Sequence, residues 1–375
     1  MSIRVLHVYR TYFPQTQGGL EEVIRQICLN TRRHDVESRV LCVSPSVEPR
    51  VVRRTEAVVY RSKLHAEVAS CSISLQMLSM FRRLLKWADV VHYHFPWPFA
   101  DVLHFAAGVK VPTVLTYHSD IVRQRFLARL YAPLMTRFLN AIDRIVCTSP
   151  NYFATSNVLP RFEDRVDIVP IGLDPASYPV AAECEIDAAR AEFGEGFFLF
   201  VGVLRYYKCL HILLDAIAGA PYRVVIVGSG PTEAELKRQA EDLKLTNVVF
   251  AGHVSDQTKV ALLALSRGVV FPSYMRSEAF GVTLLEGAMH AKPLISTEVG
   301  SGTSHVNVDG ETGLVVTPAS AKALRQAMDQ LHDHPAMADR MGLCARRRFE
   351  RLFNGGLMGD RYAGIYADLV GLSAA

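Results

Sequence analysis

The sequence predicts an α/β protein built from two doubly wound domains, each with a parallel sheet. Short apolar runs rich in β-branched residues alternate with segments of helical periodicity, which is the pattern of βα units. The alternation pauses at a stretch punctuated by proline and glycine, GLDPASYP at residues 172–179, and then restarts. The chain has 375 residues and is 50% hydrophobic, which is enough for two cores.

The first half contains an early helix and six strand-like runs. The helix is expected at residues 20–31, directly after the first run. The runs are, in order, RVLHVY, SRVLCV, DVVHYH, PTVLTYH, RIVCTS and DIVPIG. We therefore expect residues 1–175 to form an N-terminal domain.

The second half repeats the pattern from about residue 190. Its strand-like runs are FFLFVG, YRVVIVG, NVVFAG, GVVFPS and KPLIST. Helical segments are expected between them, for example at residues 209–219 and 232–243. We expect residues 176–350 to form a C-terminal domain, and residues 351–375 to form a helix that packs back on the N-terminal domain. Ligands of such folds bind at the carboxyl ends of the strands, so the loops that follow strands are the places to look for chemistry.

Charge and composition exclude several classes of function. The net charge is +4, yet residues 1–180 hold 22 lysines and arginines against 15 acids, whereas the rest of the chain holds 19 against 22. No basic run with interleaved aromatic residues appears, so nucleic acid is not an expected partner. No window approaches the roughly 20 apolar residues that a membrane span needs.

A group of arginines in the first half allows two interpretations. The group lies in an apolar stretch at roughly helical spacing, and it could meet the anionic lipid of a membrane surface or simply form a solvated helix face. Its members are Arg123, Arg125, Arg129, Arg137 and Arg144. Seven cysteines without C-x-x-C spacing, in a chain with no evident signal peptide, are expected to be reduced thiols in the cytoplasm.

Three motifs follow strand-like runs. In the first, Gly18 and Gly19 stand between a strand and the helix that follows it, where free backbone N–H groups could meet a phosphate. The alternative is an ordinary turn that needs glycine for a positive φ angle. In the second motif, VGVLRYYKC, Arg205 and Lys208 stand three residues apart after a strand. Two cations there could hold a diphosphate, or they could be solvated side chains.

The third motif, SEAFGVTLLEG, carries two acids eight positions apart. If a helix begins at about Val282, Glu278 precedes the helix and Glu286 lies one turn inside it. Eight residues at helical pitch rise by about 12 Å, close to the scale of a nucleotide sugar from hexose to ribose. The two acids could each bind hydroxyls at one end of such a ligand, whereas the alternative is one acid before the helix and one exposed acid on it.

These motifs carry a family resemblance along essentially the whole chain. SEAFGVTLLEGAM resembles the E-x7-E signature of the retaining GT-B glycosyltransferases, glycosyltransferase family 4 or glycosyl transferases group 1, and VGVLRYYK resembles their diphosphate clamp. QGGLE, VPIGLDP, VIVGSGP and DGETGLVV match further motifs in the expected order. The resemblance implies the GT-B fold, in which two Rossmann-like domains face each other across a cleft.

Further stretches resemble bacterial O-antigen and common-antigen transferases that use the GDP-sugars of mannose or D-rhamnose. They are HYHFPWPFAD, YHSDIVRQ and EVGSGTSHVNVDGETGLVV. The chain departs from the family at Cys209, which follows the clamp lysine where glycine is usual. It departs again at His290 and Ala291, where an aromatic or small residue and then glycine are frequent. Both departures put the local loop geometry in question.

The resemblance implies a role for each motif residue. Arg205 and Lys208 would neutralise the leaving diphosphate, Glu278 would hold the donor sugar, and Glu286 would bind the ribose. The remaining donor contacts would come from Gly19, from the helix start at Ala279, Phe280 and Gly281, and, for the base, from the backbone around His253 and Val254. The acceptor would lie near Gly18, Asp120 and Trp97.

Three histidines of the first half allow more than one interpretation. His118 in YHSD resembles the family histidine that touches the transferred sugar, although a histidine that ends a buried strand is often structural. His92 and His94 have the spacing of metal ligands, but the sequence shows no third partner nearby. No D-x-D motif occurs, so we expect neither a metal nor another cofactor.

The implied reaction is a hexosyl transfer with retention of stereochemistry. The donor would be a GDP-sugar and the acceptor a polyprenyl-diphosphate-linked saccharide of lipopolysaccharide O-antigen synthesis, with the enzyme on the inner face of the cytoplasmic membrane. A GT-B epimerase of nucleotide sugars, a UDP-sugar transferase and a non-catalytic binding protein are the alternatives.

Overall fold

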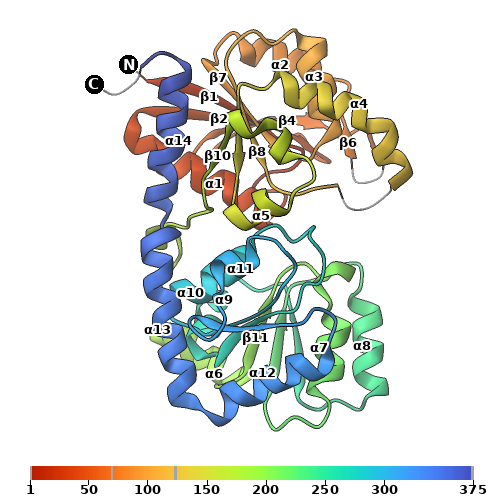
Figure 1. Ribbon diagram of the computed structural model, residues 1–375, viewed down its shortest axis with the longest axis vertical. Helices are drawn as coiled ribbons and strands as arrows, with labels where there is room; N and C mark the ends of the chain where they lie inside the picture. Colours follow the sequence, from red (N-terminus) through yellow and green to blue (C-terminus); the bar gives the residue numbers. More distant parts are fainter. Residues whose placement is uncertain (1, 69–70, 122–124, 373–375) are drawn as a thin grey trace. The chain divides into compact units, whose positions relative to one another are not determined.

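The structure is a computed structural model that describes residues 2–68, 71–121 and 125–372, without the side chains of residues 125–128. It divides into two compact units. Unit 1 contains the residues up to Gly172 together with those from Gly355 onward, and unit 2 spans Leu173–Asn354. Each unit is a mainly parallel sheet covered by helices (Figure 1), so the predicted α/β fold class is confirmed. The expected domain boundaries, at residues 175 and 350, lie within a few residues of this division.

The sheet of unit 1 has eight strands in the order β10-β9-β8-β7-β1-β2-β4-β3. All neighbouring strands are parallel except β3 and β4 at one edge. The strands are β1 Ile3–Val8, β2 Val36–Ser44, β3 Val51–Arg53, β4 Val58–Lys63, β7 Val90–Phe95, β8 Thr113–Tyr117, β9 Arg144–Cys147 and β10 Val166–Ile168. A separate hairpin pairs β5 Ala66–Val68 with β6 Cys71–Ile73. The three central strands β1, β7 and β8 are almost fully buried, as expected of a sheet with helices on both faces.

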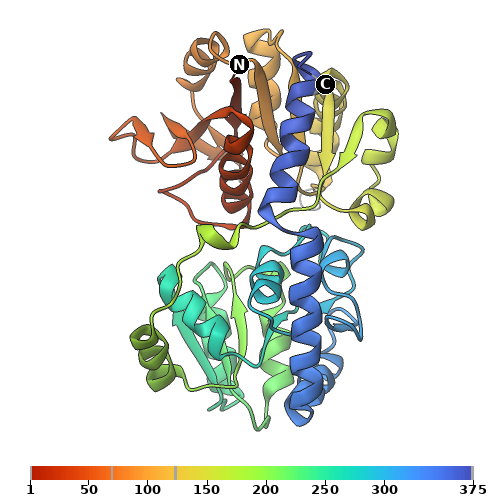
Figure 2. The same ribbon diagram turned by 90° about the vertical axis from the view of Figure 1, so that its left-hand side faces the viewer.

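The helices of unit 1 occupy the crossovers between parallel strands. They are α1 Gly19–Thr31, α2 Met77–Leu85, α3 Pro98–Ala107, α4 Arg125–Ala141 and α5 Pro150–Thr155, with 3-10 turns at η1 Arg32–His34 and η2 Leu159–Arg165. The last helix, α14 Gly355–Leu369, returns to unit 1 and packs along α1 (Figure 2). A Cβ on Gly359 would lie 2.6 Å from the Asn30 carbonyl oxygen, so glycine permits this close contact between the two helices.

The sheet of unit 2 has six parallel strands in the order β13-β12-β11-β14-β15-β16. The strands are β11 Phe198–Val201, β12 Val224–Val227, β13 Val248–Gly252, β14 Gly268–Phe271, β15 Leu294–Thr297 and β16 Gly313–Val316. Counted along unit 2, this is the order 3-2-1-4-5-6 of the Rossmann fold. The order reverses between β11 and β14, and such a switch point is where open α/β sheets bind their ligands.

Eight helices and two 3-10 turns complete the described part of unit 2. They are η3 Pro175–Ser177, α6 Glu183–Phe193, η4 Tyr206–Lys208, α7 Leu210–Ile217, α8 Glu233–Asp242, α9 Asp256–Leu265, α10 Val282–Met289, α11 Thr303–Val306, α12 Ala321–Asp333 and α13 Pro335–Leu352. Helices α7, α8 and α12 share one apolar core with the sheet, whereas α6 packs against α9 and α10 against α13. Among the described residues, none of the helices combines the length and apolar character that crossing a membrane requires.

Candidate active site

The switch point of unit 2 brings together the loops that follow β11 and β14. Backbone contacts fix the first of these loops, because Gly202 and Leu204 donate their N–H groups to the carbonyls of Val227 and Ser229 at 3.0 Å each. A Cβ on Gly228 would lie 2.1 Å from the carbonyl oxygen of Gly202. The glycines of VIVGSGP are therefore needed for the close approach of two backbones beneath the site.

Lys208 and Glu278 meet at the switch point. The Lys208 ammonium donates to a carboxylate oxygen of Glu278, and only 11% and 13% of the two side chains remain exposed. The ammonium also lies 4.4 Å from the centre of the Phe271 ring, and the Ser273 hydroxyl donates to the same oxygen of Glu278 at 3.4 Å. The sequence motifs that hold these two charges are 70 residues apart, and the fold turns them into one ion pair.

Helix α10 begins at Val282, as predicted, so Glu278 precedes the helix and Glu286 lies within it. Gly281 caps the helix at φ 89°, a left-handed conformation that favours glycine. The Thr283 hydroxyl donates to the Val201 carbonyl at 3.0 Å, and the Gly302 N–H donates to the Ala279 carbonyl at 2.8 Å. The first bond ties the start of α10 to the end of β11, and the second ties the segment before α10 to the loop that follows β15.

Arg205 has a different setting from Lys208. It caps the short turn η4, is exposed, and forms no ion pair with the described residues. Cys209, which ends the turn, has φ 57°. A left-handed residue at this point explains why relatives would favour glycine here, and Ala291, the other departure from the family pattern, has φ 54°. Both departures therefore keep the backbone conformation that glycine would adopt.

Glu286 is neither exposed nor alone. It is 5% exposed, and one of its carboxylate oxygens accepts a hydrogen bond from the Lys259 ammonium at 2.9 Å. The same ammonium lies 3.2 Å from Asp256, and Glu286 contributes to raising the pKa of Lys259 above its usual value even though burial acts in the opposite direction. The alternative of an exposed helix acid is wrong, and sequence reasoning missed Lys259. The only signal was a lysine one turn into the helix that follows a strand.

The expected base-binding segment follows β13. His253 is exposed and Val254 is half-buried, directly before α9. The hydroxyl of Ser255 caps α9 by accepting from the Thr258 N–H at 3.0 Å. Lys259 therefore lies in the first turn of the helix that directly follows His253, Val254 and the capping residue Ser255.

In unit 1, Gly18 and Gly19 lie at the start of α1. Gly18 caps the helix in an extended conformation, φ −155°, and none of the side chains that the structure describes forms a capping hydrogen bond there. The alternative interpretation, that the turn needs glycine for a positive φ angle, is therefore wrong for Gly18, and Gly19 is absent from the positive-φ glycines of the described chain. A Cβ on Gly18 would lie 2.7 Å from a carboxylate oxygen of Glu21. The carboxylate of Glu21 therefore lies close to the backbone of Gly18 at the helix start.

His118 and Asp120 follow β8 at its carboxyl end. The His118 N–H donates to the Phe95 carbonyl at 3.0 Å, and its side chain is 6% exposed. Asp120 accepts a hydrogen bond from the Tyr117 hydroxyl at 2.9 Å, and its own backbone N–H donates to the Tyr152 hydroxyl at 2.6 Å. Both residues are thus fixed in place by neighbouring strands and loops.

Trp97 does not offer its ring to an acceptor. It is 1% exposed, and its indole N–H donates to the Ser72 carbonyl at 3.1 Å. The assignment of Trp97 to acceptor binding is corrected accordingly. The residue packs between β6 and the start of α3, because an indole buries a large apolar surface and needs only one acceptor.

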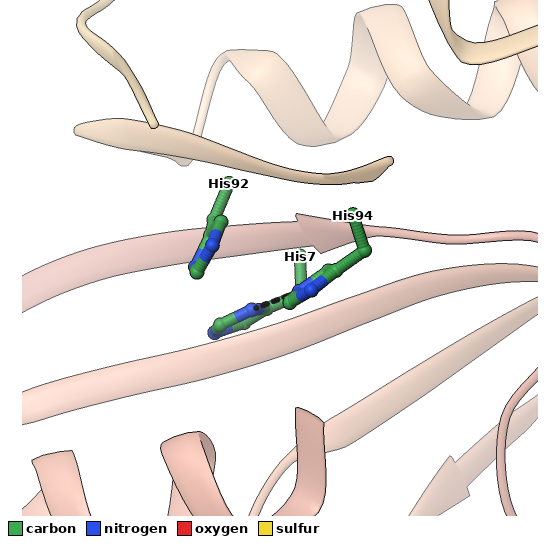
Figure 3. Close-up of side chains that lie close together, drawn as sticks. All are labelled: His7, His92 and His94. Carbon is green, nitrogen blue, oxygen red and sulfur yellow. Dashed lines mark hydrogen bonds between the residues drawn. The ribbon is translucent and has the colours of Figure 1, made fainter. Parts of the chain in front are cut away.

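The histidine pair of β7 does have a third partner. His7 on β1 is paired directly with His92 in the sheet register, and His7, His92 and His94 have ring nitrogens within 4.8 Å of one another (Figure 3). The sequence view that no third partner is near is wrong. The available signal was a histidine near the end of three strand-like runs, RVLHVY, DVVHYH and PTVLTYH.

The buried histidines are neutral at physiological pH. Burial lowers the pKa of His7 and of His118 to about 3, and it also lowers the pKa of His92 and His94 well below the ordinary value. His92 uses both ring nitrogens, which lie 2.7 Å from the Tyr366 hydroxyl and 2.7 Å from the Thr116 hydroxyl. Each of these rings can therefore be a hydrogen-bond donor on one nitrogen and an acceptor on the other.

Fold and site define the GT-B class of glycosyltransferase, with two Rossmann-like units and charged loops at the switch point of the second. Residues 17–177 match the family described as Glycosyltransferase Family 4, and residues 185–348 match Glycosyl transferases group 1. The chain belongs to this glycosyltransferase family.

Two relatives and one solved structure extend the comparison. The chain is 52% identical over 351 residues to D-rhamnosyltransferase WbpZ of Pseudomonas aeruginosa, covering 94% of this chain and 92% of the relative. It is 45% identical over 368 residues to O-antigen chain mannosyltransferase C of Escherichia coli, covering 98% and 99%. The structure of sucrose-phosphate synthase from Thermosynechococcus elongatus superposes with a TM-score of 0.81 at 21% identity over 99% and 100% of the chains, which shows a shared fold.

Proposed function

We propose that the protein transfers a hexose, mannose or D-rhamnose, from a GDP-sugar to a lipid-linked saccharide in O-antigen synthesis, with retention at the anomeric carbon. The observation that carries the proposal is the Lys208–Glu278 ion pair at the switch point, followed on the next helix by Glu286 paired with Lys259, in a chain about half identical to a D-rhamnosyltransferase. The mannosyltransferase relative supports the same class of sugar and the same kind of product.

The charges of the site suit a nucleotide sugar that lies along the start of α10. The diphosphate would take the Lys208 ammonium and the exposed Arg205, while the N–H groups at Phe280 and Gly281 would add the positive end of the helix. Glu278 would then accept hydrogen bonds from sugar hydroxyls. Glu286, held by Lys259, would accept hydrogen bonds from the ribose.

The transfer needs stabilisation of charge more than it needs a nucleophile. The bond between the anomeric carbon and the diphosphate oxygen breaks, and the electron pair leaves with the diphosphate. The acceptor hydroxyl attacks the same face and gives its proton to the departing phosphate oxygen. The two cations oppose the negative charge as it grows, which is the usual route to a large rate effect. No divalent metal is part of this proposal, because the cations occupy that role.

A transfer assay with purified donors tests the proposal. The protein is incubated with GDP-mannose, GDP-D-rhamnose or UDP-glucose and a lipid-linked saccharide, with and without EDTA. We expect hexose transfer from a GDP-sugar that EDTA does not inhibit. Release of an altered free sugar from donor alone would instead identify an epimerase, and transfer from UDP-glucose alone would contradict the proposed donor.

Unit 1 carries the proposed membrane contact. On α4, Arg129 and Arg137 are exposed, and Leu130 between them is 66% exposed. A basic and apolar helix face of this kind binds anionic lipid surfaces in a salt-dependent manner. Sedimentation with anionic and neutral vesicles at low and high salt tests the contact. Binding that ignores both lipid charge and salt would contradict it.

A further inference from the structure

We infer that His7 and His94 are positioning residues that hold His118 in its Nδ1–H tautomer, so that the free edge of His118 presents a hydrogen-bond donor. The inference rests on three side chains from three adjacent strands of unit 1, β1, β7 and the end of β8. It deepens the proposed function, because His118 is the histidine expected to contact the transferred sugar.

The three imidazoles form one hydrogen-bonded ribbon. The Nδ1 atom of His7 lies 3.2 Å from Nε2 of His94, and Nδ1 of His94 lies 3.1 Å from Nε2 of His118. The rings are nearly parallel, at 19° and 25° between successive planes, with centres 5.5 and 5.4 Å apart. Figure 3 shows the first of these contacts, with His7 and His94 edge to edge.

The ribbon has a direction, since every link joins Nδ1 of one ring to Nε2 of the next. A neutral imidazole has one N–H, so only two proton arrangements satisfy both links. Either all three rings carry hydrogen on Nδ1, or all three carry it on Nε2. A mixed arrangement would set two lone pairs or two N–H groups against each other at one link.

The buried end of the ribbon selects between the two arrangements. Nε2 of His7 is buried and has no hydrogen-bond partner among the described residues. With hydrogen on Nε2 of all three rings, this atom would be a buried N–H group without an acceptor. Buried donors without a partner are rarer in folded proteins than buried acceptors without one. With hydrogen on Nδ1 throughout, only a lone pair is left unpaired. The second arrangement places an N–H on Nδ1 of His118.

His118 ends the ribbon at its open side. His7 and His94 are 0% and 1% exposed, whereas His118 is 6% exposed and its Nδ1 forms no hydrogen bond with the described residues. A ligand at this edge therefore meets a donor. A sugar hydroxyl or ring oxygen can accept a hydrogen bond from the Nδ1–H group of His118. Burial keeps the ring neutral, so His118 gains no second N–H group and Nδ1 remains its one donor.

A metal site built from His7, His92 and His94 fits this geometry less well. The lone pairs of imidazole lie in the ring plane, and His92 stacks over His94 with ring centres 4.4 Å apart and planes 27° apart. The two rings therefore do not direct their lone pairs at one point. Both nitrogens of His92 are also paired, with Tyr366 and Thr116. Binding of an ion would have to break one of these bonds.

Nitrogen NMR of the full-length protein labelled with 15N-histidine reads the tautomer directly. Long-range correlations between ring nitrogens and ring carbon-bound hydrogens distinguish a protonated from a bare nitrogen, and the His118 signals are assigned by their loss in His118→Asn. We expect Nδ1 of His118 to be protonated, in contrast to the Nε2–H form that histidine favours in water. An Nε2–H form of His118 in the wild-type protein would overturn the inference.

Two substitutions at His94 separate the donor from the rest of the ring. His94→Asn keeps an N–H donor near the position of Nδ1, whereas His94→Gln places its amide near the position of Nε2 and loses the donor toward His118. We expect His94→Gln to lower kcat about 10-fold, the effect of one lost hydrogen bond. We expect His94→Asn to keep most of the wild-type kcat. His104→Asn is the control, because His104 is a buried histidine that bonds Tyr93, outside the ribbon. Equal losses in the two His94 variants would contradict a role for the donor.

Failure of the inference and failure of the proposed function are distinguishable. If NMR finds Nδ1–H on His118 but His118→Asn leaves transfer unchanged, the tautomer assignment stands and the sugar contact falls. If zinc added to the wild-type protein binds stoichiometrically and binding is lost in His92→Gln, the three histidines form a metal site and the ribbon interpretation is overturned.

Discussion

The candidate site residues of the two units are opposite in kind. In unit 2, Lys208 with Glu278 and Lys259 with Glu286 form charged pairs at loops and a helix start, and each pair includes a partly exposed member. In unit 1, four histidines lie inside the sheet as neutral rings bonded to one another and to hydroxyl groups. Charged pairs can rearrange around a charged ligand, whereas a network of neutral rings fixes the direction of its hydrogen bonds. The comparison separates a unit suited to bind a diphosphate from one suited to orient a polar contact.

Removal of the clamp lysine should give the largest effect. Lys208→Met deletes one of the two cations of the switch point and leaves Glu278 without its ion-pair partner. We expect kcat/KM for transfer to fall about 100- to 1,000-fold, the usual loss when one electrostatic stabiliser of the transition state is removed. Lys237→Met is the matched control, because Lys237 pairs with Glu233 on the surface of the same unit at 2.8 Å. Activity of Lys208→Met within 3-fold of the wild-type value would contradict the assignment of diphosphate binding to the charged pairs of unit 2.

The buried pair of α9 and α10 should matter for stability. Lys259→Met leaves the Glu286 carboxylate buried without its cation, and we expect the free energy of unfolding to fall by about 3 kcal/mol. The double variant Lys259→Met with Glu286→Gln should recover most of the loss, because no unpaired charge remains. Urea denaturation of the four proteins measures the coupling. Simple additivity of the two single losses would show that the pair is not coupled.

Acid should weaken unit 1 through its histidines. An unfolded histidine binds a proton below about pH 6.5, whereas His7 and His118, with a pKa of about 3, do not bind one in the folded state until about pH 3. The unfolded chain therefore holds more protons in this window, and stability falls as pH falls through it. From pH 7.5 to 5 we expect a loss of about 2 kcal/mol for each of the two rings.

Asp101 opposes this trend and has to be removed for the measurement. Burial raises the pKa of Asp101 to about 8, so its protonation at lower pH favours the folded state. Asp101→Asn removes this opposing contribution, and urea denaturation of the variant at pH 7.5 and 5 measures the combined effect of the buried histidines. Unfolding free energies that stay equal at the two pH values would contradict neutral, buried rings in unit 1.

A smaller effect is expected where a side chain occupies a left-handed turn. Ala291 has φ 54°, which costs a non-glycine residue about 1 kcal/mol or more. Ala291→Gly should therefore raise the free energy of unfolding by roughly 0.5 to 1 kcal/mol, after the entropic cost of glycine. Ala188→Gly, at an exposed position inside α6, should lower it by about 1 kcal/mol. Thermal unfolding of both variants tests the opposite signs.

Local pattern was sufficient to predict the α/β class, most strands, and the start of α10 at Val282. Those features depend on periodicity and on glycine within a few residues. The partners of the acids and histidines could not be predicted, because Lys259 reaches Glu286 from another helix and His7 reaches His94 across 87 residues of sequence. Trp97 was misassigned for a related reason. An aromatic residue in a loop motif gives no local sign that a backbone carbonyl of β6 will accept the hydrogen bond of its indole N–H.

The most direct test of the central claim is calorimetric titration of GDP into the wild-type protein, Lys208→Met and Glu286→Gln. The claim is that the nucleotide diphosphate binds at the switch point between β11 and β14 of unit 2. We predict measurable binding to the wild-type protein and at least about 10-fold weaker binding to each variant, equivalent to about 1.4 kcal/mol. Equal affinity in all three proteins would place the nucleotide elsewhere and contradict the account.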